Sequence, residues 1–326
     1  MKRLFLFILA MLTVNLTACA QSRITSEVNN TGRHITVNDT VSFIINHSAF
    51  EGFGRYLMPW DNHNRNYDIP ITQIGLLMPY HDYIRPQVVV DSVNYMIDEV
   101  SRGEIIFYDF YTQQDKDADP SKANVGLFFF RGNPGAPFVL LIPGGGFSYV
   151  GSLHEGFPLA VEIAKKGYNA FVIKYRPSRT LITSDVVAAL SYIFDHSVSL
   201  GVSTNDFSLW GLSAGGTPVA DISLSGMAAY GKADLPKPCM AVFLYAWQPR
   251  FSQNDPAVFT AIGETDRIGN VKRLEIEVRA SQAAGANIEY HLFRNTGHGF
   301  GLGTGTNAEG WLDLAILFWE KHMETG

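Results

Sequence analysis

From residue 138 onwards, short apolar runs alternate with amphipathic segments. The run 138–142 (FVLLI) is apolar at every position, which is typical of a parallel strand buried on both faces. Repeated alternation of strands and helices predicts a mostly parallel, doubly wound sheet with helices on both faces. The expected strands are 138–142, 170–175, 207–210, 240–245, 258–262 and 288–293, and the expected helices are 158–166, 185–198, one after Ser213, 271–284 and 310–322.

The pattern before residue 138 is less regular. Apolar runs at 105–108 and 125–130 predict two more strands, and the polar stretch between them predicts a hairpin loop. Within 36–103, a helix is expected to begin at Pro86 and to end before Gly103, because its valines and isoleucines have helical spacing. We expect 36–103 to be an N-terminal extension or lid, and 104–326 to be the main domain.

The aromatic residues of the 36–103 segment leave two interpretations open. They would form a lid or a wall on which a sugar stacks, or they would simply pack in the interior. The residues concerned are Phe50, Phe53, Tyr56 and Trp60.

The first residues have the pattern of an export signal. A basic start is followed by an apolar run over 4–14, which is too short for a transmembrane helix of ~20 residues. The order Leu-Thr-Ala-Cys at 16–19 resembles the lipobox of bacterial lipoproteins, in which the cysteine is lipidated after cleavage. The resemblance implies a signal peptide over 1–18, lipidated Cys19 with a polar tether to residue 35, and an exported domain.

The expected export signal also predicts where the protein is located in the cell. The anchored domain would lie in the periplasm or at the cell surface, and Ala20 favours the outer membrane if the cell is Gram-negative. The alternative is an ordinary signal peptide with a chance cysteine.

Composition narrows the function classes. Hydrophobic residues make up 46% of the 326-residue chain and charged residues 17%, which excludes a disordered protein. The net charge of −6 argues against nucleic-acid binding. The chain has two cysteines, so lipidation of Cys19 would leave Cys239 without a disulfide partner, and we expect it to be a buried structural thiol. The histidines lack metal-ligand spacing, and we expect neither a metal nor a cofactor.

Residues 211–215 (GLSAG) lie directly after an expected strand and before an expected helix. This G-x-S-x-G pattern is the nucleophile elbow in its required context, since the tight turn needs small residues on either side of the serine. Ser213 is therefore the candidate nucleophile. A purely structural turn is the alternative.

Residues 143–147 (PGGGF) follow an earlier apolar strand. Three glycines let backbone N–H groups face a cavity, where they could form an oxyanion hole with the N–H of Ala214. A phosphate-binding loop is the alternative, but residues 143–147 are not followed by the Gly-Lys-Ser/Thr ending that this motif requires.

His298 lies between glycines after the last expected strand, and we expect it to be the general base. His63 and His81 could line a pocket, and the other histidines lack such a setting. The acid should lie between Ser213 and His298 in the chain. Asp266 fits best because it lies a few residues beyond a strand end, and Glu264 and Asp255 are its rivals.

Together these motifs, in this order over 104–322, resemble the α/β-hydrolase superfamily. Within it the chain looks most like the acetylxylan and feruloyl esterase-like branch, which is related to hormone-sensitive-lipase-type esterases. That group begins its oxyanion loop with His-Gly-Gly-Gly, whereas Pro143 replaces the histidine here. The resemblance implies that the N–H groups of Gly145 and Gly146 hold the oxyanion beside Ala214.

The implied activity is hydrolysis of a carboxylic ester through an acyl-enzyme, with acetyl or feruloyl groups on carbohydrate as the expected substrates. A general short-chain lipase or esterase remains open. A prolyl-oligopeptidase-type peptidase is another alternative, although the sequence shows no blade-length repeats. A different class is a non-catalytic binding lipoprotein that kept the fold.

Overall fold

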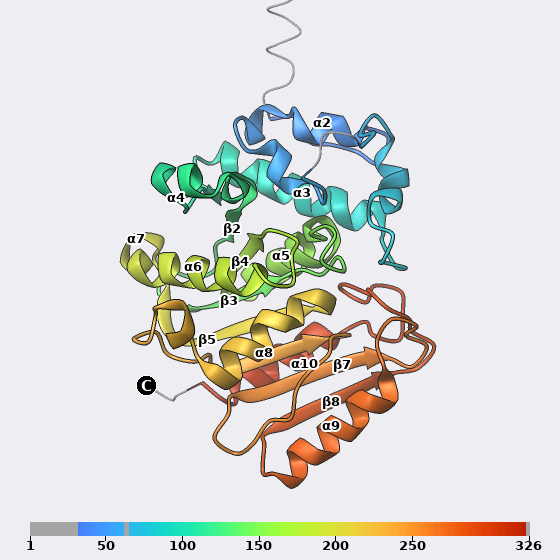
Figure 1. Ribbon diagram of the computed structural model, residues 1–326. Coiled ribbons are helices and arrows are strands. Elements are labelled where there is room, and N and C mark those ends of the chain that lie inside the picture. Colours follow the sequence, from blue (N-terminus) through green and yellow to red (C-terminus); the bar gives the residue numbers. More distant parts are fainter. Residues whose placement is uncertain (1–31, 62–64, 324–326) are drawn as a thin grey trace, which may run out of the picture.

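The computed structural model describes residues 32–61 and 65–323, and the expected signal peptide and Cys19 lie outside them. An eight-stranded sheet has the order β1-β2-β4-β3-β5-β6-β7-β8 (Figure 1). β1 and β4 are antiparallel to β2, and β4, β3, β5, β6, β7 and β8 are mutually parallel. The strands are β1 (Phe107–Tyr108), β2 (Gly126–Phe130), β3 (Pro137–Ile142), β4 (Asn169–Lys174), β5 (Ser203–Leu212), β6 (Met240–Leu244), β7 (Ala257–Gly263) and β8 (Ile288–Phe293).

Helices cover both faces of this sheet, as the sequence predicts (Figure 1). Val139 and Leu141 of β3 point to the face where α3, α5 and α10 pack. Their neighbours Leu140 and Ile142 point to the face covered by α6 and α8, because successive strand residues face opposite sides. The helices are α2 (Val41–Ile45), α3 (Pro86–Ser101), α4 (Gln113–Ala118), α5 (Phe157–Lys165), α6 (Ile182–Asp195), α7 (Ser197–Leu200), α8 (Gly216–Ser225), α9 (Val271–Ala283) and α10 (Trp311–Glu320).

The hairpin loop expected between β1 and β2 is wrong. Helix α4 occupies this stretch and begins with a capping box, in which Thr112 and Asp115 exchange side-chain and backbone hydrogen bonds. The polar composition that indicated a loop is also that of a solvent-exposed helix, and α4 has no buried residue.

The segment before β1, which includes α3, packs against the sheet on the side of α5. Phe50 is fully buried, Phe53 stacks on Phe107 with ring centroids 5.0 Å apart, and the indole N–H of Trp60 donates to Leu77 O at 2.7 Å. These contacts favour the packing interpretation of the aromatic residues.

A buried lysine fastens this segment to the middle of the sheet. Lys174 Nζ, at the end of β4, donates to Met58 O at 2.8 Å and to Pro59 O at 3.0 Å. It also pairs with Asp61 Oδ1 at 2.9 Å. Burial lowers the pKa of Lys174, and the nearby carboxylate opposes this shift.

Cys239 lies just before β6 and is partly buried. Its thiol donates to Asp206 O at 3.1 Å and accepts from the indole of Trp319 at 3.2 Å. Burial raises the pKa of Cys239 to about 12, so the group stays a thiol at neutral pH. Over the part of the chain that the structure describes, no helix has the length and apolarity needed to span a bilayer.

Candidate active site

The nucleophile elbow has the geometry that its motif predicts. Ser213 follows β5 directly and has φ 50°, a backbone conformation that residues other than glycine rarely adopt. A Cβ on Gly215 would overlap the carbonyl oxygen of Ile142, and one on Gly211 would overlap the backbone of Gly215. Gly215 is therefore required for the close approach between the elbow and β3, and Gly211 for the tight turn of the elbow itself.

The structure brings Ser213, His298 and Asp266 together in a line. Ser213 Oγ lies 2.8 Å from His298 Nε2, and His298 Nδ1 lies 2.8 Å from Asp266 Oδ2. The side chains of His298 and Asp266 are 4% and 0% exposed. Asp266 Oδ1 also accepts the backbone N–H groups of Ile268 and Gly269, at 2.8 and 2.6 Å. The carboxylate is thus held by its own loop, and it orients the imidazole toward the serine.

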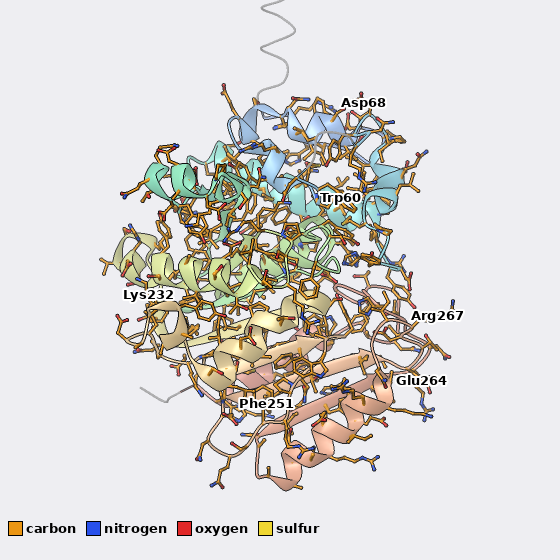
Figure 2. All side chains as sticks on the ribbon, viewed as in Figure 1. Trp60, Asp68, Lys232, Phe251, Glu264 and Arg267 are labelled. Carbon is orange, nitrogen blue, oxygen red and sulfur yellow. The ribbon has the colours of Figure 1, made fainter. Side chains whose placement is uncertain are left out.

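The two rival acids lie elsewhere. Glu264 is exposed at the edge of the molecule, where Figure 2 labels it, and its carboxylate accepts the backbone N–H of Asn295 at 3.1 Å. Asp255 accepts from the backbone and hydroxyl of Ser252. Neither carboxylate contacts His298 in the structure.

The glycine loop after β3 passes directly beside the serine. Gly145 and Gly146 have φ 137° and 61°, and a Cβ on Gly144 would lie 2.7 Å from Ser213 Cβ. Among the described residues, the N–H groups of Gly145 and Gly146 have no hydrogen-bond acceptor. They are therefore available to a ligand oxygen at this place, as an oxyanion hole requires.

A buried glutamate that sequence reasoning missed supports this loop from behind. Glu155 lies in a π-helical turn, Ser152–Gly156, that leads into α5. Its Oε2 accepts from Gly144 N, and its Oε1 accepts from the Tyr245 hydroxyl at 2.8 Å and lies 2.9 Å from His81 Nε2. Because the carboxylate faces donors at every contact, the arrangement stabilises its ionised form.

The electrostatics of this cluster follow from burial and contact. Burial would raise the pKa of Glu155, but His81, His154 and the Gly144 N–H lower it to about 2. Burial lowers the pKa of His154 to about 4, so this imidazole is neutral; its Nε2 lies 2.7 Å from Gly299 O. Burial and the neighbouring Glu155 raise the pKa of Tyr245 well above its ordinary value.

The N-terminal segment also reaches the site. The Tyr149 hydroxyl accepts the backbone N–H of Tyr80 at 3.0 Å and lies 2.8 Å from His81 Nδ1. The Tyr83 hydroxyl accepts the N–H of Gly297 at 2.7 Å, next to His298. Sequence reasoning proposed only that His81 could line a pocket, whereas His81 lies in the buried support of the glycine loop.

A cavity of about 270 Å³ opens beside Ser213 and His298. Its other walls come from the loops after β6 and β7 and from the start of α9, which packs beside β8. The lining residues include Tyr245, Trp247, Gln248, Ile268, Asn270 and Arg273. Among residues 32–61 and 65–323, no group of three or more His, Cys, Asp or Glu side chains is placed to hold a metal ion.

Comparison with known proteins starts from a family model. Residues 131–241 match the model named BD-FAE. The chain is also 31% identical over 102 residues to an acetylxylan esterase of Xylanibacter ruminicola. That match covers 30% of this chain and 21% of the relative, so the chain spans about a fifth of its curated relative's length.

Solved structures resemble a larger part of the chain. An α/β-hydrolase enzyme from a Medee basin deep-sea metagenome library, MGS-M1, has a TM-score of 0.51 at 24% identity, over 60% of this chain and 92% of that one. The esterase Est2 of the planctomycete Thermogutta terrifontis has a TM-score of 0.56 at 17% identity, over 67% and 93%. Carboxyl esterase 2 of Tuber melanosporum has a TM-score of 0.52 at 18% identity, over 61% and 83%.

The family model covers the glycine loop and Ser213 and ends before Asp266 and His298. The protein therefore has the α/β-hydrolase fold, as its sequence predicts, and within that fold residues 131–241 resemble the BD-FAE family.

Proposed function

We propose that this protein is a serine carboxylesterase. The observation that carries the proposal is the pair of 2.8 Å contacts that join Ser213 to His298 and His298 to Asp266. These contacts lie beside a glycine loop with free N–H groups. The combination provides a nucleophile, a base, an orienting acid and an oxyanion site, which together are sufficient for acyl transfer.

The mechanism follows from these positions. His298 Nε2 takes the proton of Ser213 as Oγ attacks the ester carbonyl, and Asp266 stabilises the resulting imidazolium. The N–H groups of Gly145, Gly146 and Ala214 bind the developing oxyanion; one such donor is worth ~3 kcal/mol in the transition state. His298 then protonates the leaving alcohol, and water releases the acid from the acyl-enzyme.

We propose acyl groups on carbohydrate, acetyl or feruloyl, as the substrates. The similarity of residues 131–241 to BD-FAE and of 102 residues to an acetylxylan esterase supports this choice. A general short-chain esterase or lipase and a prolyl-oligopeptidase-type peptidase stay as alternatives, and so does a binding protein without activity.

The first experiment is hydrolysis of p-nitrophenyl acetate by residues 20–326, with the Ser213→Ala variant beside the wild type. Loss of turnover by orders of magnitude in the variant supports the esterase. Covalent labelling of Ser213 by a fluorophosphonate tests the nucleophile separately from substrate choice. A wild type that neither turns over nor becomes labelled would favour the binding protein, and amide cleavage faster than ester cleavage would favour the peptidase.

We also propose that the enzyme is exported and lipid-anchored through Cys19. Support comes from the lipobox-like order at 16–19 and the apolar run before it. Incorporation of labelled palmitate into the wild type but not into Cys19→Ser, with release of the variant from the membrane fraction, is the expected result. A wild type without label would indicate an ordinary signal peptide.

A further inference from the structure

Gln248 lines the cavity beside Ser213 with a buried carboxamide that lacks a hydrogen-bond partner among the described residues. This residue is 1% exposed and lies after β6, in the loop that also contains Trp247. Within the part of the chain that the structure describes, neither Nε2 nor Oε1 of this carboxamide has a hydrogen-bond partner. Buried amides are nearly always paired, so this one calls for a partner from outside the chain.

The chemistry of a glutamine limits what that partner can be. The carboxamide donates through Nε2 and accepts through Oε1, so it suits a ligand that both donates and accepts. Vicinal hydroxyl groups have this property, whereas an alkyl chain would leave the amide unpaired at a cost. An apolar residue at 248 would avoid that cost, and so the amide indicates a polar ligand.

The rim of the cavity supplies the complementary surface. The Trp247 side chain lines the cavity and is 53% exposed, although large aromatic residues are usually well covered. A sugar ring has an apolar face of C–H groups and an edge of hydroxyls. A flat indole and a buried carboxamide in one cavity match those two features.

The position of His298 indicates which part of the ester, the acyl group or the alcohol, would occupy the cavity. The imidazole must deliver its proton to the leaving alcohol oxygen, so the alcohol lies on the His298 side of Ser213. The cavity borders His298 and the loop of Ile268 and Gly269, whose N–H groups hold Asp266. The glycine loop with the oxyanion donors is not part of its lining. Its volume of about 270 Å³ is at the small end for ligand pockets and suits a small group.

We propose that this cavity is the subsite for the alcohol part of the ester, and that Gln248 selects a hydroxyl-bearing sugar ring stacked on Trp247. The inference rests on the proposed esterase function and specifies its substrate. Gln248 acts as a specificity residue here, through hydrogen bonds to hydroxyls next to the ester oxygen.

The test compares two esters of one acid. The first is a monoacetylated methyl β-xyloside, and the second is cyclohexyl acetate, whose ring has no free hydroxyl. Gln248→Met keeps the length of the side chain and removes the amide. We expect kcat/KM on the sugar ester to fall about tenfold to hundredfold, with less than a threefold change on cyclohexyl acetate. Equal losses on both esters, or no loss on either, would overturn the proposal.

Two further variants serve as a control for Gln248→Met and as a test of the stacking on Trp247. Gln253→Met, on the same loop but exposed, is the matched control and should leave both rates unchanged. Trp247→Ala removes an exposed side chain, which is compatible with folding, and should lower kcat/KM on the sugar ester selectively. If Trp247→Ala affects both esters alike, the stacking part of the proposal fails.

A binding measurement separates this proposal from the esterase function. Saturation-transfer NMR with methyl β-xyloside, which has no ester, should give a signal with the wild type and with Ser213→Ala but not with Gln248→Met. An active esterase without this signal would overturn the subsite and leave the function standing. A signal that requires Gln248, in a protein that hydrolyses no ester, would support the subsite and overturn the function.

Discussion

The buried carboxylate of Glu155 accepts the backbone N–H of Gly144 at 2.5 Å. Gly144 directly precedes the two glycines whose free N–H groups face the site, so this bond fixes the direction in which the loop leaves β3. Glu155 therefore acts through the glycine loop: its carboxylate contacts Gly144, and the next two glycines carry the N–H groups proposed to bind the oxyanion.

We therefore predict that Glu155→Gln lowers kcat, by about tenfold to hundredfold, with little change in KM. The amide nitrogen of glutamine would face either the Gly144 N–H or both the Tyr245 and His81 donors, and this donor–donor contact would displace the glycine loop and its oxyanion N–H groups. Steady-state kinetics on p-nitrophenyl acetate measure the effect. Glu162→Gln, on α5 in an exposed pair with Lys165, is the control and should behave as the wild type. A rise in KM alone would count against a role through the loop.

Asp266→Asn should lower kcat by about 10³–10⁴-fold, because an amide cannot stabilise the imidazolium and favours the wrong tautomer of His298. Glu264→Gln should keep kcat within about twofold of the wild type, since the Glu264 carboxylate accepts the Asn295 N–H and does not contact His298. The ratio of the two kcat values assigns the acid. A larger loss in the Glu264 variant would reverse the assignment.

His154 makes stability depend on pH. Burial lowers its pKa from 6.5 to about 4 in the folded protein, whereas the unfolded chain takes up a proton near 6.5. Above pH 6.5 His154 is neutral in both states and its protonation does not reduce the free energy of unfolding. As the pH falls toward 4, the unfolded chain takes up the proton first, and the free energy of unfolding falls by about 3 kcal/mol, at ~1.4 kcal/mol per pKa unit. Glu155, with a pKa of about 2, stays ionised throughout this window.

Urea unfolding at several pH values between 7 and 4 tests this expectation. The free energy of unfolding should fall more steeply for the wild type than for His154→Gln, in which no proton is taken up at this position. Parallel curves for the two proteins would contradict the prediction.

The elbow glycine Gly215 should tolerate no side chain. Its added Cβ would overlap the backbone carbonyl of Ile142, and neither backbone can move without disturbing β3 or the elbow. Gly215→Ala should cost about 2–4 kcal/mol in the free energy of unfolding. Gly75→Ala, where the nearest atom to the new Cβ is 4.0 Å away, should cost far less. Similar losses at both positions would show that the overlap at Gly215 relaxes.

The sequence predicted the sheet and its helices after residue 137 because both rest on local periodicity, and the strand ends then placed Ser213 and the loops around it. It could not predict that Glu155 is buried. A glutamate before a helix looks like a surface residue, and its burial depends on His81 and Tyr245, which lie far away in the chain. The sequence could not predict the unpaired amide of Gln248 either, because a missing hydrogen-bond partner can be recognised only in the folded structure. Helix α4 was missed because exposed helices and loops share a composition.

The segment before β1 makes three hydrogen bonds to two loops at the site. Tyr80 bonds to Tyr149 in the glycine loop. Tyr83 bonds to Gly297 and Arg85 to Thr304 O at 2.7 Å, both in the histidine loop between β8 and α10. Detachment of this segment would release the glycine loop and the histidine loop together. On heating, loss of activity and loss of ordered structure should then be one event rather than two. Residual activity after a heat pulse would thus report directly the fraction of molecules that kept their fold.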